Sequence, residues 1–405
     1  MKKQTLQPCV RAGNYKADPL KGNFGMKSHF KFTSLGLLVT LSGSCSQPPE
    51  LKSAHKDSGN ANGTKVGNLD PEVGDPILPT PTPTPVGNVV IKDPVPPIKT
   101  PEPVPEPEVS KEGDGDFPIG PQYTKDPQMN IRDNIAKGKV QQFSMKSSDS
   151  KIYKGTETDQ GLTKPQAFTR DAWIYTPAGY KDNTEVPFMI VQDGRDYKYV
   201  DIIDNLIADK KIPAIAVIFI NPGPGDGMGS QRGLEYDTVS TAYAEFVETE
   251  VLPKITTDFK VKFTADPEGR ATMGGSSGAA AALTMAWLRN DLYHRILSYS
   301  GTFVAQHPDK TYPAGAWEFH SDMNLIMNSA KKNLRIYMEV GSRDNNFGGN
   351  RDWTEANKRT AKALAAKGYH YRYNYADDAG HVDRRVVNQT LPEALIWLWR
   401  GYKAK

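Results

Sequence analysis

Ser276 lies in a run of small residues that could expose a nucleophile. The segment from Gly274 to Gly278 has the spacing Gly-x-Ser-x-Gly. In a sharp strand-to-helix turn of this kind, the serine takes a strained conformation and the glycines prevent clashes between strand and helix. The backbone N–H of Ser277 then points to where an oxyanion would form. A glycine-rich packing turn is the alternative, but the flanking apolar segments favour a nucleophile.

A serine hydroxyl needs a neighbouring base to attack an ester. In folds with such a turn, the acid and then the histidine follow the serine, each after a later strand. His381 comes after the last predicted strand and before the final predicted helix, so chain order selects it as the base. The other histidines of the predicted folded part lie earlier, at His294, His307, His320 and His370.

The acid that orients the histidine should follow the preceding predicted strand. The segment IYMEVGSRDNN offers Glu339 inside the strand pattern and Asp344 in the loop after Gly341. A loop carboxylate can accept a hydrogen bond from the far N–H of the histidine and stabilise the imidazolium. We therefore predict Asp344 as the acid, with Asp352 and Asp377 as alternatives.

A second oxyanion donor is expected from the loop after an earlier strand. The segment VQDGRDY ends that strand, and Gly194 would let the backbone approach a substrate. The backbone N–H of Gly194 or of Arg195 is the candidate. Each donor of this kind contributes roughly 3–4 kcal/mol of transition-state stabilisation.

These side chains need a sheet whose strand ends lie together. The sequence alternates strand and helix patterns, which predicts an α/β fold with a mostly parallel central sheet and helices on both faces. Sites in such folds lie at the carboxyl ends of the strands. The predicted strands, some given together with the turn or loop that follows them, lie within residues 139–145, 171–177, 187–194, 213–227, 269–275, 295–302, 334–344 and 369–381, and the strand that begins at 213 runs into a glycine-rich loop. The predicted helices are 199–212, 237–259, a helix from 278, 353–368 and 391–402.

Composition excludes several other classes of protein. The 405 residues carry a formal net charge of +3, from 50 basic and 47 acidic residues, which gives no argument for nucleic-acid binding. No group of side chains has metal-ligand spacing, and no glycine loop has a Walker or dinucleotide pattern. We therefore expect neither metal nor cofactor.

The N-terminal third reads as a leader and a spacer rather than as a folded domain. Basic residues, an apolar run and small residues lead from Met26, the predicted true start, to Cys45, as in a bacterial lipoprotein signal. Thirteen of the 31 prolines fall between Pro71 and Pro107, which predicts an extended spacer. We divide the chain into a leader (1–45), a disordered proline-rich tether (46–115) and one catalytic domain (116–405). The protein is then a membrane-tethered lipoprotein or a secreted bacterial protein.

Several segments together resemble the enterochelin esterase and esterase D type of α/β hydrolase. They include RDAWIYTPAGY, FMIVQDGRDY, GRATMGGSSGAAAAL, EVGSRD and AGH, in this order, and the resemblance covers roughly residues 138–402. It implies a serine hydrolase in which Ser276, Asp344 and His381 occupy the triad positions. Arg232 and Glu235 match an arginine and an acid that recur beside the family's site, where they either bind substrate or form a structural ion pair.

The resemblance predicts the mechanism better than the substrate. The leading hypothesis is an extracytoplasmic carboxylic-ester hydrolase that acts through an acyl-enzyme on a siderophore, feruloyl or acetylated-sugar ester. An acyltransferase on the same site and an inactive surface binding protein are the alternatives. Trp317 and Trp353 could stack on a sugar or an aromatic acyl group, or could simply pack against neighbouring helices.

Overall fold

The computed structural model describes residues 111–158, 162–194, 197–321 and 324–403. The predicted leader, most of the predicted tether and Cys45 lie outside these residues. The described strands are β1 (Gly115–Ile119), β2 (Lys139–Lys146), β3 (Thr169–Thr176), β4 (Glu185–Val186), β5 (Phe188–Gln192), β6 (Ala216–Ile220), β7 (Lys262–Phe263), β8 (Arg270–Gly275), β9 (Arg295–Tyr299), β10 (Arg335–Gly341) and β11 (His370–Ala376).

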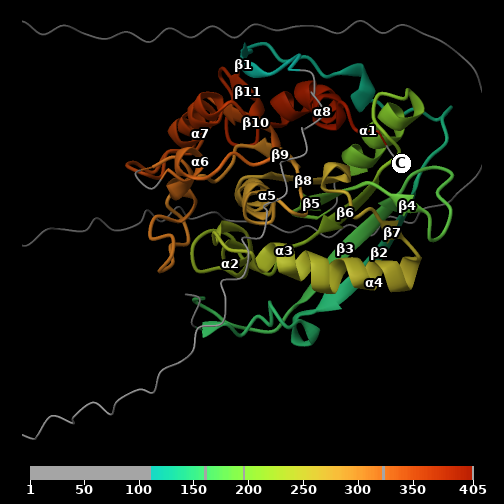
Figure 1. Ribbon diagram of the computed structural model, residues 1–405, viewed down its shortest axis with the longest axis horizontal. Coiled ribbons are helices and arrows are strands. Elements are labelled where there is room, and N and C mark those ends of the chain that lie inside the picture. The colour runs from blue at the N-terminus through green and yellow to red at the C-terminus, as the bar shows by residue number, and fades with distance from the viewer. Residues whose placement is uncertain (1–110, 159–161, 195–196, 322–323, 404–405) are drawn as a thin grey trace, which may run out of the picture. The chain divides into compact units, whose positions relative to one another are not determined.

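Nine of these strands form one central sheet in the order β1-β11-β10-β9-β8-β5-β6-β3-β2 (Figure 1). Neighbouring strands run parallel except where β3 pairs with β2 and with β6. The short strands β4 and β7 form a separate parallel pair. The α-helices are α1 (Tyr197–Ala208), α2 (Gln231–Asp237), α3 (Ala242–Phe246), α4 (Leu252–Phe259), α5 (Ser277–Leu288), α6 (Leu325–Asn328), α7 (Trp353–Lys367) and α8 (Arg384–Trp399).

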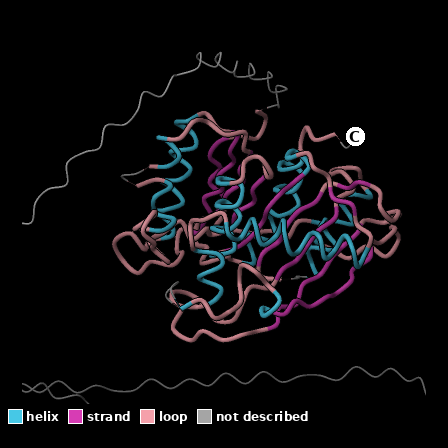
Figure 2. The backbone as a smooth tube through the Cα atoms, turned by 60° about the horizontal axis from the view of Figure 1, so that its bottom comes forward, coloured by secondary structure: helices cyan, strands magenta, loops and turns pink. Residues whose placement is uncertain are grey.

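Helices cover both faces of the sheet, as the alternating pattern predicts (Figure 2). The α/β class with a mostly parallel sheet is therefore confirmed. Along β6, Ile218 belongs to the hydrophobic cluster under α3, α4, α5 and α7, whereas Val217 and Phe219 belong to the cluster under α1 and α8. Because successive side chains of a strand point to opposite faces, a strand buried on both sides reads as an unbroken apolar run.

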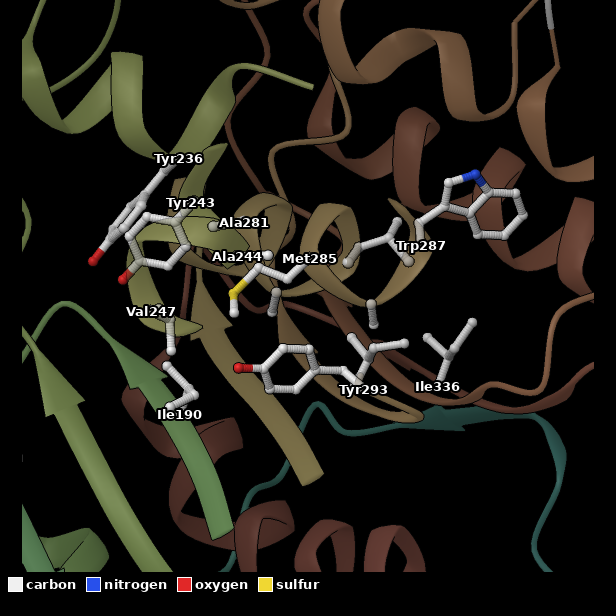
Figure 3. Close-up of a cluster of buried hydrophobic side chains, with 14 of the residues drawn as sticks. Ile190, Tyr236, Tyr243, Ala244, Val247, Ala281, Met285, Trp287, Tyr293 and Ile336 are labelled. Carbon is white, nitrogen blue, oxygen red and sulfur yellow. The ribbon is translucent and has the colours of Figure 1, made fainter. Parts of the chain in front are cut away.

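The alanine-rich start of α5 lets that helix lie close to the sheet. Ala279 to Ala282 are almost fully buried, and they add little bulk between the helix and β8. Figure 3 shows part of the cluster on this face, in which Met285 of α5 lies with Tyr243 of α3 and Ile190 of β5. This close packing fixes the position of the turn between β8 and α5.

The structure differs from the predicted elements in three places. The helix predicted over 237–259 is divided: α2 ends at Asp237, and α3, a π-helical turn (Val247–Val251) and α4 follow. The final helix begins at Arg384 rather than near Leu391, because the carboxylate of Asp383 caps it by accepting from the Arg385 N–H. The strand β1 is an addition, since its five residues, which include a glycine and a proline, pair in parallel with β11.

Candidate active site

Ser276 forms the turn between β8 and α5, in a backbone conformation with φ 57° and ψ −128°. The glycines around it are required by the close approach of strand and helix. A Cβ on Gly274 would lie 2.2 Å from the carbonyl carbon of Gly278, and a Cβ on Gly278 would lie 2.8 Å from a carboxylate oxygen of Asp193. The small residues of this segment therefore serve a tight turn that presents a serine, as the spacing predicts.

Ser276, His381 and Asp344 form one hydrogen-bonded chain. The Nε2 atom of His381 lies 2.8 Å from Ser276 Oγ, and its Nδ1 atom lies 2.6 Å from Asp344 Oδ1. The carboxylate can only accept, so Nδ1 carries the proton and Nε2 is free to accept from the serine hydroxyl. The three residues follow β8, β11 and β10, whose carboxyl ends meet at one edge of the sheet.

The two partners of the serine differ in exposure. The Asp344 side chain is fully buried, and the His381 side chain keeps 25% of its surface. Asp344 Oδ1 also accepts from the Asn345 N–H at 2.6 Å. The Ser300 hydroxyl accepts from the Val382 N–H at 2.9 Å and so holds the histidine loop against the strand ends. This arrangement fixes the imidazole ring while its Nε2 side remains reachable.

The alternative acids have other partners. Asp352 caps α7 by accepting from the Glu355 N–H, and Asp377 accepts from the Ser342 hydroxyl. Glu339 is completely buried inside β10. Burial, and then the negative charge of Asp344, raise the pKa of Glu339 well above its usual range. Burial therefore disfavours the charged form of Glu339, and Asp344 is the carboxylate that contacts His381.

Ser277 provides the first backbone amide of α5, a position where N–H groups lack an acceptor within the helix. Its side chain is anchored: the hydroxyl donates to Asp237 Oδ2 at 3.0 Å, and Gln306 Nε2 donates to the same oxygen at 2.7 Å. Burial raises the pKa of Asp237 to about 6, although both hydrogen bonds oppose the rise. The sequence reasoning missed this role of Asp237, which it placed at the start of a helix.

Gly194 does not offer a free amide in this structure. Its N–H donates to the Ile220 carbonyl at 2.9 Å, so the prediction of Gly194 as an oxyanion donor is wrong for this conformation. The reason is that the residue takes a positive φ of 78° and turns its N–H back toward β6. Arg195, the other candidate, lies outside the described residues.

A cavity of about 450 Å³ opens beside Ser276 and His381. One wall is apolar and belongs to the α1 and α8 side of the sheet, and the other carries the charged groups of Asp193, Asp226 and Arg232. The sequence reasoning did not find the apolar wall, because its members are core-type residues scattered over four elements and the loop before α8. Those apolar members are Val191, Tyr199, Met273, Tyr299 and Val382.

Arg232 and Glu235 are separated by the structure. Arg232 lines the cavity, where its guanidinium bonds both Asp193 carboxylate oxygens and, through Nη1, Asp226. Glu235 is buried and makes a bidentate pair with Arg170, at 2.7 and 2.8 Å. Of the two alternatives for Glu235, the structural ion pair holds, because the buried side chain bonds Arg170 of β3 and does not line the cavity.

The two candidate tryptophans do not line the cavity either. The Trp353 side chain is buried, donates from Nε1 to Thr302 Oγ1 at 3.1 Å, and packs edge-on against His381. Trp317 packs edge-on against His320, with the Arg359 guanidinium 5.0 Å from its ring centre. Both tryptophans therefore pack against neighbouring side chains of the fold, which was the alternative to stacking on a substrate.

Among the residues that the structure describes, no three histidine, cysteine or acidic side chains are grouped so that they could hold a metal ion. Within the same part of the chain, no helix is long and apolar enough to cross a membrane. The predicted lipid attachment at Cys45 is not addressed by these residues.

The fold is that of an α/β-hydrolase-type esterase. The family described as "Putative esterase" matches residues 169–398, which is more than half of the chain. The protein belongs to this family and is by class a carboxylic-ester hydrolase. No curated protein matches the sequence.

Solved structures of esterases share the fold. A CE1 ferulic acid esterase from the anaerobic fungus Anaeromyces mucronatus has a TM-score of 0.50 at 13% identity, over 69% of this chain and 97% of the other. The ferric enterobactin esterase of Salmonella typhimurium has a TM-score of 0.46 at 19% identity, over 64% of this chain and 58% of the other. The enterobactin esterase of Shigella flexneri has a TM-score of 0.47 at 17% identity, over 66% and 61% of the two chains.

Proposed function

We propose that the protein is a serine esterase in which Ser276 is the nucleophile, His381 the general base and Asp344 the orienting acid. The observation that carries this proposal is the hydrogen-bonded chain from Ser276 Oγ through both nitrogens of His381 to a buried carboxylate. The chain lies at the mouth of a cavity large enough for an acyl group.

In the first half-reaction, Ser276 Oγ attacks the ester carbonyl as its proton passes to His381 Nε2. The negative charge that develops on the carbonyl oxygen is stabilised by the Ser277 N–H, and the Arg195 N–H is the candidate second donor. The imidazolium, stabilised by Asp344, then gives its proton to the departing alcohol oxygen. The products are an acyl-Ser276 enzyme and a free alcohol.

In the second half-reaction, His381 takes a proton from water, which attacks the acyl-enzyme carbonyl. The proton then returns to Ser276 Oγ, and a carboxylic acid leaves. If a sugar hydroxyl replaces water, the same steps give acyl transfer, so hydrolase and acyltransferase differ only in the acceptor. A catalytically inactive binding protein would have no use for this aligned chain.

The cavity favours an uncharged acyl group of moderate size. Its apolar wall can hold a phenolic or short acyl chain, and the charge of Arg232 is already balanced by Asp193 and Asp226. We therefore propose an ester of the feruloyl, acetylated-sugar or siderophore type as the substrate. The solved structures that share the fold include a CE1 ferulic acid esterase.

The test is hydrolysis of a panel of 4-nitrophenyl, feruloyl, acetyl-xylan and catechol siderophore esters by the full chain. We expect turnover of at least one extended ester and of short nitrophenyl esters, and no turnover above a few per cent by Ser276→Ala. A folded wild-type protein that hydrolyses none of them, or an active Ser276→Ala variant, would overturn the proposal. Products formed with and without added xylo-oligosaccharide distinguish hydrolysis from acyl transfer.

We also propose that the enzyme works outside the cytoplasm, tethered through a lipid on Cys45. The support is the signal-like segment before this cysteine and the proline-rich spacer after it. We expect the wild-type protein to fractionate with membranes, and Cys45→Ser to appear in the soluble fraction with its esterase activity intact. Mass spectrometry that finds an unmodified Cys45 in an uncleaved chain would contradict this proposal.

A further inference from the structure

Phe347 is an exposed aromatic residue at the rim of the site. It lies in the loop between β10 and α7, and 66% of its surface is accessible. In the described part of the chain, the other large apolar side chains with comparable exposure are Ile131 and Met228. A single exposed apolar residue needs no explanation by itself, so its value as evidence depends on how it is held and what lies beside it.

The loop holds Phe347 in one place. The Phe347 N–H donates to the Arg351 carbonyl at 2.9 Å, and the Arg351 N–H donates to the Gly348 carbonyl at 3.1 Å. Asn346 and Asp352 form a β-bridge at the base of this hairpin. The ring packs edge-on against Trp353, with centres 5.7 Å apart, and the Arg351 guanidinium lies 5.1 Å from its centre. The phenyl group is therefore preorganised rather than loosely displayed.

This ring is connected directly to the reacting groups. Trp353, which supports Phe347, packs edge-on against His381 with ring centres 6.1 Å apart. The Trp353 indole N–H donates to Thr302 Oγ1, which lies 3.4 Å from Ser276 Oγ. Phe347 is thus one ring away from the imidazole and extends the same wall into solvent.

The wall made by Thr302, Trp353 and Phe347 is distinct from the cavity beside Ser276. None of the three residues lines that cavity, whose apolar wall belongs to the cluster under α1 and α8. Trp353 belongs to the cluster on the opposite face of the sheet. A bound ester has two parts, so if its acyl group fills the cavity, its alcohol part lies toward Phe347, on the side where His381 must protonate the leaving oxygen.

We propose that Phe347 is the platform on which the alcohol part of the substrate stacks, and that this part is a sugar ring of a glycan. The inference rests on the proposed esterase function of Ser276. A pyranose ring has an apolar C–H face that fits an aromatic ring and a rim of hydroxyls that needs polar partners. The loop contains amide side chains at Asn345, Asn346 and Asn350, and the guanidinium of Arg351 lies 5.1 Å from the centre of the phenyl ring.

The surroundings argue against a protein partner at this point. The exposed apolar surface is a single side chain, and a stable protein interface buries on the order of 800 Å² on each partner. Its neighbours in the chain are polar residues and two glycines with positive φ, Gly348 and Gly349, at which a Cβ would meet no atom within 4 Å. The Arg351 guanidinium lies over the ring, which still keeps 66% of its surface accessible. A single rigid ring with polar neighbours suits one sugar unit.

Binding of xylopentaose, which has no ester, tests the inference without turnover. We use the full chain with Ser276→Ala and follow binding by calorimetry. We expect Phe347→Ala to weaken binding on the order of tenfold and Phe347→Tyr to retain it, because tyrosine keeps the ring. Ile131→Ala, which removes an equally exposed apolar side chain elsewhere, should leave binding unchanged. Absence of binding to the Ser276→Ala protein, or equal binding by Phe347→Ala, would overturn the inference.

A kinetic measurement separates this inference from the proposed function. In the otherwise wild-type chain, Phe347→Ala should raise the KM for acetylated xylo-oligosaccharide relative to that for 4-nitrophenyl acetate by on the order of tenfold. An equal change for both esters would mean a general disturbance and would overturn the inference. Hydrolysis of nitrophenyl esters without xylopentaose binding would contradict the inference but not the proposed function. Xylopentaose binding without hydrolysis of any ester would contradict the proposed function but not the role of Phe347 in binding.

Discussion

Two polar clusters contain residues that the sequence suggests for function: the Ser276, His381 and Asp344 chain, and the Arg170 and Glu235 pair. They differ in whether a polar atom is left available to a ligand. In the first, the Ser276 hydroxyl donates to His381 and His381 donates to Asp344, and the hydroxyl oxygen faces a cavity. In the Arg170 and Glu235 pair, both carboxylate oxygens are bonded to the guanidinium, and Gly223 N–H and Gln231 Nε2 add further donors.

The difference shows what makes a charged group available for chemistry. Glu235 is saturated by donors and its pair is sealed, with the guanidinium packed against Phe168 and Phe246. Such a pair can stabilise the fold but has no proton or lone pair to give a substrate. His381 keeps a quarter of its surface and an unprotonated nitrogen toward the serine. Whether the hydrogen bonds of a charged group are already satisfied within the fold is therefore better evidence for or against a role in catalysis than its position beside a motif.

The largest expected effect comes from Asp344, the acid of the Ser276, His381 and Asp344 chain. Asp344→Asn should lower kcat on the order of 10⁴-fold, because an amide can hold the imidazole in the wrong tautomer. Glu339→Gln is the matched control, five residues earlier in the chain, and should leave kcat nearly unchanged because burial disfavours the charged form of this carboxyl group and His381 Nδ1 bonds Asp344 instead. Steady-state kinetics on 4-nitrophenyl butyrate measure both. Severe loss in Glu339→Gln with a mild effect of Asp344→Asn would reverse the assignment.

Substitutions in the Arg170 and Glu235 pair should change the stability of the protein rather than its turnover. Arg170→Met leaves Glu235 buried without its charged partner, which should cost roughly 3–5 kcal/mol of unfolding free energy in urea. The double variant Arg170→Met/Glu235→Leu should recover much of that loss, because no unpaired charge remains. The kcat per folded molecule should stay near that of the wild type. If Arg170→Met instead removed activity while stability held, Glu235 would belong to the site after all.

The smallest effect concerns Asp237, which anchors Ser277. Its folded pKa of about 6 lies above the ordinary value of 3.8. The native state therefore holds this proton more tightly, and the stability it contributes below pH 4 is lost as pH rises through 6. Asp237→Asn has no such proton and does not lose this stability. Between pH 4 and pH 7, the stability of the variant relative to the wild type should therefore increase by roughly 2–3 kcal/mol. Parallel urea-denaturation curves with no pH-dependent difference would contradict the raised pKa.

The sequence was sufficient for the elements that carry local signals. Periodicity and glycine placement predict β5, β8, β10 and β11. The Gly-x-Ser-x-Gly spacing selects Ser276, chain order selects Asp344 and His381, and the structure joins the three by hydrogen bonds. These inferences work because a parallel sheet brings the ends of successive strands to one edge. The catalytic roles themselves remain predictions.

Other features depend on long-range contacts that no local pattern contains. Arg170, the partner of Glu235, lies 65 residues earlier in the chain. The burial of Trp353 depends on Thr302 and His381, which come from distant segments. The Gly194 amide bonds back to Ile220 of the neighbouring strand. In each case a partner remote in sequence decides whether a suitable side chain or amide is used by the fold or left for a ligand.

Trapping the acyl-enzyme is the most direct test of the central claim that Ser276 is a nucleophile activated by His381. The full chain is quenched in acid during turnover of 4-nitrophenyl butyrate, or after treatment with a fluorophosphonate, and its peptides are analysed by mass spectrometry. We predict one adduct per chain, on Ser276, and a strongly reduced rate of labelling in His381→Ala. An adduct on another residue, or labelling of Ser276 that is as fast without His381 as with it, would contradict the account.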